Sequence, residues 1–187
     1  MFNEIDFSKI DITSEPPVKE TERQYYYMAK LAAMVTLKEQ ELGRPVTYCL
    51  QTFGCQMNEK QSEVVAGIMD EIGFKRQETE NADIVIYNTC TVRENANLKV
   101  YGRLGKLHSL KKSNPDMKIA LFGCMMQEKQ VVDKIRKDYP FVNLVFGTHN
   151  IFKFAELFYE MENRDSQLID IWDSTDKIVE ELPTERN

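Results

Sequence analysis

Short apolar runs alternate with longer stretches of helical periodicity along most of the chain. The runs are rich in Val, Ile, Leu, Tyr and Phe and predict β-strands over 46–52, 83–88, 118–122 and 143–146, with a short one at 74–77. Elsewhere apolar residues recur every three or four positions, which predicts helices over 22–42, 58–72, 126–137 and 151–161. Thr91 and Glu94 have the spacing of a capping box, so a further helix is expected to begin there.

Strands that alternate with helices, and that are apolar nearly throughout, predict a parallel sheet covered by helices on both faces. The fold class indicated is α/β: a flavodoxin-like three-layer sandwich with a mostly parallel, roughly five-stranded sheet of order 2-1-3-4-5. Residues 167–172 are the candidate for an added strand. Residues 1–20 lack periodicity and predict an extended lead-in, the main domain is expected over 21–165, and an acidic linker over 166–187.

Charge is unevenly distributed along the chain. The 24 basic and 30 acidic residues give a net charge of −6. Residues 93–118 nevertheless contain seven basic and two acidic residues, whereas residues 156–187 contain ten acidic and three basic ones. The acidic total argues against a protein that coats nucleic acid over its whole surface, but the basic segment could meet phosphates at one patch. There Lys99, Arg103 and Lys106 form one helical stripe, which is equally explained as the solvated side of an amphipathic helix.

The first thirty residues contain six acidic side chains, which is atypical of a targeting sequence. The longest apolar run in the helical parts is 31–35, far shorter than the roughly 18 residues that span a bilayer. We therefore expect a cytoplasmic protein without membrane attachment. In that compartment the four cysteines are expected to be thiols or metal ligands rather than disulfides.

Three cysteines occupy the same step of the predicted fold, in the turn between a strand and the next helix. Cys55, Cys90 and Cys124 follow the first, third and fourth strands, which are neighbours in the expected order. The thiols should therefore converge at the carboxyl edge of the sheet, where helix N-termini favour the thiolate. Three converging thiolates form a soft metal site. Cys49 lies inside a strand and is expected to be an ordinary core residue.

The spacing of the cysteines leaves the kind of site open. His149, at the same edge after the fifth strand, would complete a zinc site of three cysteines and one histidine. A 4Fe-4S cluster on the three cysteines would instead leave one iron open. A flavodoxin-like cofactor module is a further alternative, although the turn at 53–57 is a poor phosphate cradle. Asn58 and Asn88, beside two of the cysteines, would form hydrogen bonds to sulfur, although helix capping explains Asn58 equally well.

Three segments around these cysteines resemble the motifs of the radical-SAM methylthiotransferase family. They are Thr52-Phe53-Gly54-Cys55-Gln56-Met57-Asn58, Asn88-Thr89-Cys90-Thr91-Val92-Arg93-Glu94-Asn95-Ala96 and Gly123-Cys124-Met125. Gln56-Met57-Asn58 and the stretch 101–105 resemble the MiaB branch, which methylthiolates isopentenylated adenosine beside the tRNA anticodon. Other branches act on threonylcarbamoyl-adenosine in tRNA or on an aspartate of a ribosomal protein.

The resemblance implies that Cys55, Cys90 and Cys124 bind an auxiliary 4Fe-4S cluster that carries or donates sulfur. It also implies a radical-SAM domain with a second 4Fe-4S cluster and S-adenosylmethionine, an RNA-binding domain, a sulfur donor, and the tRNA anticodon stem-loop as substrate. The radical-SAM motif Cys-x3-Cys-x2-Cys does not occur among the four cysteines of this chain. We therefore expect an N-terminal methylthiotransferase domain over 21–165, followed by the linker at 166–187, that binds a cluster without completing turnover.

Overall fold

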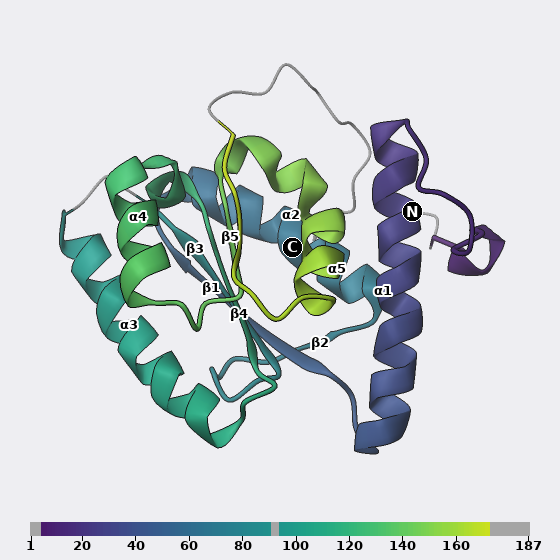
Figure 1. The fold of residues 1–187 in the computed structure, drawn as a ribbon, viewed down its shortest axis with the longest axis horizontal. Helices are drawn as coiled ribbons and strands as arrows, with labels where there is room; N and C mark the ends of the chain where they lie inside the picture. Colours follow the sequence, from purple (N-terminus) through teal and green to yellow (C-terminus); the bar gives the residue numbers. More distant parts are fainter. Residues whose placement is uncertain (1–4, 91–93, 173–187) are drawn as a thin grey trace.

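The computed structural model describes residues 5–90 and 94–172, in which a twisted parallel sheet lies between two layers of helices (Figure 1). The strands are β1 (Thr47–Phe53), β2 (Lys75–Arg76), β3 (Ile84–Thr89), β4 (Lys118–Phe122), β5 (Leu144–Phe146) and β6 (Leu168–Asp170). Their order is β2-β1-β3-β4-β5-β6, and every pair is parallel. The predicted flavodoxin-like sandwich and its strand order are confirmed, and β6 extends the predicted sheet by one strand.

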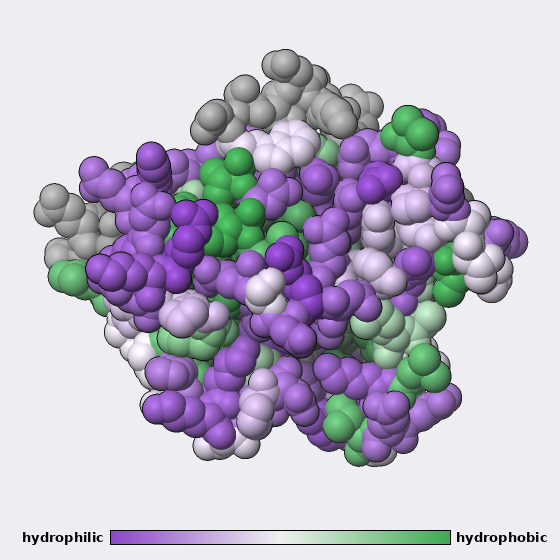
Figure 2. All heavy atoms as spheres, viewed as in Figure 1, coloured by the Kyte–Doolittle hydropathy of each residue, from purple (hydrophilic) through white to green (hydrophobic). Residues whose placement is uncertain are grey.

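The helices divide between the two faces of the sheet. The long helices are α1 (Glu20–Leu42), α2 (Gln56–Ile72), α3 (Glu94–Ser113), α4 (Lys129–Asp138) and α5 (Phe154–Glu162), and the short 3-10 helices are η1 (Phe7–Lys9), η2 (Cys124–Gln127) and η3 (Thr148–Lys153). One core packs α1, α2 and α5 on the sheet, and a second core packs α3 and α4 on the opposite face. Hydrophilic residues cover most of the face seen in Figure 2, and the apolar residues there form small, separate groups.

Successive side chains of a strand point to opposite faces of the sheet, so each strand contributes residues to both cores. In β1, Tyr48 and Leu50 enter the core under α2, whereas Cys49 between them enters the core under α3. Cys49 is 1 % exposed, and burial raises the pKa of its thiol. Such a strand is apolar at consecutive positions because both of its faces are covered. The prediction that Cys49 is a core residue is confirmed.

Several ends of the predicted elements differ from the structure. The helix predicted over 126–137 is interrupted because Glu128 is extended, which separates η2 from α4. The lead-in contains η1, and the Ile5 amide donates a hydrogen bond to Glu71 of α2 (2.9 Å). β6 lies inside the segment predicted as the linker, so the sheet extends at least to Asp170. Residues 1–4, the rest of the linker at 173–187, and Thr91 of the expected capping box lie outside the described residues.

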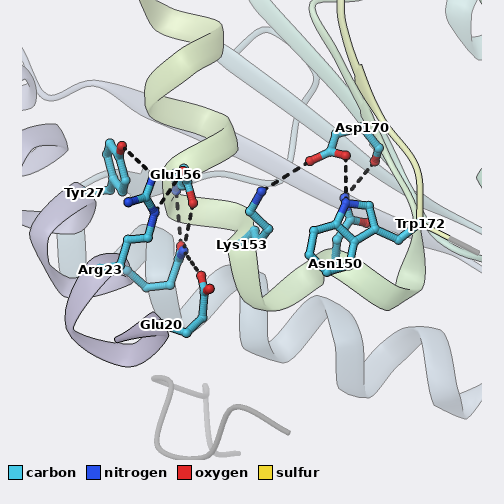
Figure 3. A network of polar contacts seen from close by, with 9 residues as sticks. Glu20, Arg23, Tyr27, Asn150, Lys153, Glu156, Asp170 and Trp172 are labelled. Atoms are coloured by element: carbon cyan, nitrogen blue, oxygen red, sulfur yellow. Dashed lines mark hydrogen bonds and ion pairs between the residues drawn. The ribbon is translucent and has the colours of Figure 1, made fainter. Parts of the chain in front are cut away.

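Two polar networks fix the outer elements to α5 and the turn before it (Figure 3). Arg23 of α1 donates two hydrogen bonds to the buried Glu156 of α5, from Nε at 3.0 Å and from Nη2 at 2.5 Å. Asp170 of β6 accepts from the Trp172 indole at 3.0 Å with its side chain and from the Asn150 amide at 2.7 Å with its carbonyl. These contacts join the first helix and the last strand to the same part of the fold.

An ion pair at the amino end of the sheet predicts acid sensitivity. Asp83 accepts hydrogen bonds from Arg44 (2.8 and 2.7 Å) and from the Thr47 amide (2.8 Å). The Arg44 hydrogen bond is the main cause that lowers the pKa of Asp83 from 3.8 to about 2.

A carboxyl group whose pKa is lower in the folded state than in the unfolded state stabilises the fold when the pH is above the unfolded-state pKa. This stability is lost as the pH falls towards the folded-state pKa. Between pH 5 and pH 2 the wild-type chain should lose about 2 kcal/mol more unfolding free energy than Asp83→Asn in urea titrations. Equal losses would contradict this role.

Candidate metal centre

The structure places the three predicted site cysteines at the carboxyl ends of adjacent strands. Cys55 is the N-cap of α2, Cys90 follows β3 directly, and Cys124 begins η2 after β4. The Cys90 amide donates to the carbonyl of Phe53 (3.0 Å), which ties the second cysteine loop to the end of β1. Cys55 is exposed, Cys124 is half-buried and Cys90 is buried, so the group opens to solvent on the side of Cys55.

The three thiols lie close enough to alter one another's protonation. Hydrogen bonds from the backbone amides of Asn58 and Met57, with one from the Cys90 thiol, lower the pKa of Cys55. Burial raises the pKa of Cys124, and the neighbouring charges of Cys90 and Cys55 raise it further. The thiolate is therefore more favoured at Cys55 than at Cys124.

Glycine precedes Cys55 and Cys124 because the backbone there approaches other groups closely. A Cβ at Gly54 would lie 2.4 Å from Asn58 Oδ1, and a Cβ at Gly123 would lie 2.3 Å from the carbonyl oxygen of Thr89. Gly123 also has a φ of +113°, which is unfavourable for other residues. The Gly-Cys pairs of both motifs therefore have a structural reason: they allow the cysteine loops to lie against β3 and α2.

Buried amides lie directly beneath the cysteine loops. Asn58 and Asn88 are fully buried, and the Asn58 amide group donates to Asn88 Oδ1 (2.8 Å) and to the Thr89 carbonyl (3.3 Å). Asn58 Oδ1 then faces Cys55 and accepts hydrogen bonds from its backbone amide and its thiol, both at 3.3 Å. The prediction that Asn58 caps α2 needs correction: Cys55 is the N-cap, and Asn58 closes the capping box from the third helical position.

Polar residues that were not predicted from the sequence complete this network. The Asn88 amide donates to Ser62 Oγ (3.0 Å), which shares a hydrogen bond with Thr52 (2.8 Å). The Thr89 hydroxyl donates to the carbonyl of Phe122 in β4 (3.0 Å). The available signal was helical spacing, because Ser62 lies one turn after Asn58 on the face of α2 that is otherwise apolar. The network links the three strands that end in the cysteine loops.

Comparison with known proteins identifies the family of the chain. Residues 47–147 match the uncharacterized protein family UPF0004, a span that includes all three cysteine loops. The chain belongs to this family. A relative from Lachnoclostridium phytofermentans, named tRNA-2-methylthio-N(6)-dimethylallyladenosine synthase, is 61 % identical over 159 residues, which cover 85 % of this chain and 35 % of the relative.

Two further relatives carry the same name. The one from Acetivibrio thermocellus is 47 % identical over 169 residues, covering 90 % of this chain and 35 % of the relative. The one from Clostridioides difficile is 44 % identical over 171 residues, covering 91 % and 36 %. The sequence-based recognition of the MiaB branch of methylthiotransferases is thus confirmed. The chain spans about a third of the length of these relatives.

In this UPF0004 chain, two of the three basic residues of the predicted stripe form ion pairs with a carboxylate. Glu80 is 3 % exposed and pairs with Arg103 (2.9 Å) and Lys106 (2.7 Å) of α3, and it also accepts a short hydrogen bond from Tyr87. Burial alone would raise the pKa of Glu80, but these partners outweigh it and lower the pKa. Arg103 and Lys106 therefore compensate a buried carboxylate, although both side chains are exposed, as expected for the solvated side of an amphipathic helix. Lys99 is exposed.

Single-ion binding and cluster binding place different demands on this family's cysteines. Within the described ranges, no three His, Cys, Asp or Glu side chains lie close enough to hold one metal ion, so the alternative site with His149 is not assembled there. Cysteines of a cluster bind different irons and need not approach as closely as the ligands of one ion.

No helix among the described residues is long and apolar enough to cross a membrane.

Thiol labelling of the metal-free chain should distinguish the core cysteine from the site cysteines. We expect iodoacetamide to modify Cys55 first, because it is exposed and its pKa is lowered, and Cys49 last, because it is 1 % exposed. Peptide mass spectrometry over a time course measures the order. Modification of Cys49 before the chain unfolds would contradict its placement in the core.

Proposed function

We propose that this chain is the cluster-carrying domain of a tRNA methylthiotransferase and that Cys55, Cys90 and Cys124 hold its auxiliary 4Fe-4S cluster. The observation that carries the proposal is the meeting of three thiols at adjacent strand ends, close enough to shift one another's pKa. Thiolates are the usual protein ligands of such clusters. When bound, the cluster would supply the sulfur, or an open iron to carry it, because three cysteines leave one of four irons without a protein thiolate.

The residues around the cysteines have defined parts in this proposal. Backbone amides at the start of α2 stabilise the Cys55 thiolate, and Asn58 orients the Cys55 loop through its side chain. Burial and the neighbouring cysteines raise the pKa of Cys124, and a bound cation would favour its thiolate. The buried amide network holds the loops in place, so the protein retains the geometry of the ligand set before metal binds.

The name shared by the relatives supports tRNA with dimethylallyl-adenosine as the substrate of the parent enzyme. The second 4Fe-4S cluster and S-adenosylmethionine would belong to another part of that enzyme, since this chain has no Cys-x3-Cys-x2-Cys motif. This chain alone is therefore expected to be inactive in turnover. A tRNA substrate is consistent with a cytoplasmic location, and an external sulfur donor would renew the transferred sulfur.

The test of this function uses the full-length parent enzyme. Cys55→Ala, Cys90→Ala and Cys124→Ala should each abolish methylthiolation of tRNA, while the reductive cleavage of S-adenosylmethionine continues. Cys49→Ala is the matched control and should retain methylthiolation within about threefold, since it removes only a small core side chain. Mass spectrometry of tRNA nucleosides provides the measurement. Full methylthiolation by any of the first three variants would overturn the proposal.

A further inference from the structure

The two helical layers carry opposite charge. Helices α1, α2 and α5 contain eleven acidic and four basic residues, a net charge of −7. Helices α3 and α4 contain nine basic and three acidic residues, a net charge of +6. The sheet separates the two layers, with α3 and α4 on the left and α1 on the right in Figure 1. The domain is therefore strongly polarised, and a polyanion would be attracted to one layer and repelled by the other.

Four lysines of the positive layer are exposed. They are Lys99 and Lys112 on α3 and Lys129 and Lys137 on α4, and none has a carboxylate partner among the side chains of residues 5–90 and 98–172. The remaining cations of the layer are partly engaged, for example Lys134 with Asp138 (2.7 Å). Four unpaired lysines on two adjacent helices are available to phosphate groups.

A ladder of four rings runs between these helices. Tyr101 stacks on Tyr139 (5.7 Å between ring centroids), Tyr139 meets Phe141 edge-on (5.9 Å), and His108 stacks on Phe141 (4.5 Å). Lys134 lies over the Tyr101 ring at 5.4 Å. His108 is exposed and the other three rings are half-buried, so the ladder forms part of the surface. Rings interleaved with cations are typical of surfaces on which unpaired bases stack.

The charged layer begins at the cysteine loops. α3 follows the Cys90 loop, and α4 follows Cys124 after the short helix η2. A chain of phosphates lying along α3 and α4 would therefore lead to the edge of the sheet where the thiols meet. Within this domain, no other layer combines a positive net charge with that position.

We propose that α3 and α4 form an RNA-binding face of this domain. Lys99, Lys112, Lys129 and Lys137 contact phosphates, and the ring ladder contacts unpaired bases. The inference rests on the proposed function for the identity of the RNA, which is the tRNA substrate delivered to the cysteine edge. An acidic protein segment would satisfy the charge, but it would make no use of the exposed His108 ring and the half-buried rings beside it as stacking partners.

The experiment measures the affinity of this chain for a synthetic anticodon stem-loop RNA by fluorescence anisotropy over a salt series. The variant replaces Lys99, Lys112, Lys129 and Lys137 by Gln. Its Kd should rise at least about tenfold, and the slope of log Kd against log salt should fall by roughly two or more. The matched control replaces Lys19, Lys38, Lys60 and Lys75 by Gln, which changes the net charge equally but lies outside the two helices. The control should stay within about twofold of the wild type.

Three results would overturn the inference: no RNA binding by the wild-type chain, equal weakening in the variant and the control, or displacement of the RNA by polyglutamate at equal charge concentration.

His108→Ala should weaken binding a few-fold without changing the salt slope, because it removes a ring and not a phosphate contact. Iron content, measured on the same reconstituted samples, separates this inference from the proposed function. Weakened RNA binding with full iron content supports the RNA face, whereas RNA binding without iron contradicts the cluster proposal alone.

Discussion

Gly123→Ala is expected to destabilise the domain and to abolish metal binding at the cysteine edge. The added Cβ would lie 2.3 Å from the Thr89 carbonyl oxygen and 2.7 Å from the Thr89 amide nitrogen, both backbone atoms of a fully buried residue. The φ of +113° adds backbone strain that alanine cannot avoid. Together these effects should cost on the order of 3 kcal/mol of unfolding free energy, measured by urea titration.

Gly105→Ala is the matched control for that substitution. Gly105 lies inside α3, and a Cβ there would meet nothing within 4 Å. Alanine is a better helix former than glycine, so this variant should be unchanged or more stable by roughly 0.5–1 kcal/mol. A Gly123→Ala chain as stable as the Gly105→Ala chain would contradict the close approach of the Cys124 loop to β3.

Asn88→Leu should have the second-largest effect. Asn88 is fully buried and makes three hydrogen bonds with its side chain, to the Asn58 carbonyl (2.6 Å), to Ser62 Oγ (3.0 Å) and from the Asn58 amide (2.8 Å). Leucine has a similar volume but satisfies none of them, so the metal-free chain should lose about 2–3 kcal/mol of unfolding free energy. Because Asn58 also orients Cys55, iron bound per folded chain should fall as well.

The control for Asn88→Leu is Asn163→Leu at the exposed end of α5. The side chain of Asn163 donates a hydrogen bond to the Tyr159 carbonyl (2.7 Å), and water can replace it. This change should cost less than about 0.5 kcal/mol and should leave the iron content unchanged. Equal stability and equal iron content in the two variants would show that the buried network has no part in forming the site.

The sheet and its order were predictable because the physical signal was strong at each step. Strands that are apolar nearly throughout indicated a sheet covered on both faces, and that predicted where the cysteine turns would meet. Boundaries were less predictable. The break between η2 and α4 depends on the extended backbone of Glu128, a residue that ordinarily favours helix. The role of β6 depends on pairing with β5, which lies more than twenty residues earlier in the sequence.

The site was partly predictable for the same reason. The positions of the cysteines could be predicted from the ends of the strands, but the hydrogen bonds of the nearby polar residues depend on long-range contacts. Glu80 lies in a loop with no motif, and its pairing with Arg103 and Lys106 across 23 and 26 residues left no local pattern. Ser62 and Thr89 likewise gain their importance from neighbours on other strands. A stripe of basic residues on a helix therefore needed the fold before its free and engaged members could be distinguished.

The most direct test of the central claim is an iron count after anaerobic reconstitution of this chain with iron and sulfide. We expect about four irons per chain for the wild type and for Cys49→Ala, and loss of the cluster in Cys55→Ala, Cys90→Ala and Cys124→Ala. The visible spectrum, recorded on the same samples, should show the cluster only where the iron is retained. Zinc bound in place of iron, or equal loss of iron in Cys49→Ala, would contradict a cluster held by the three strand-end cysteines.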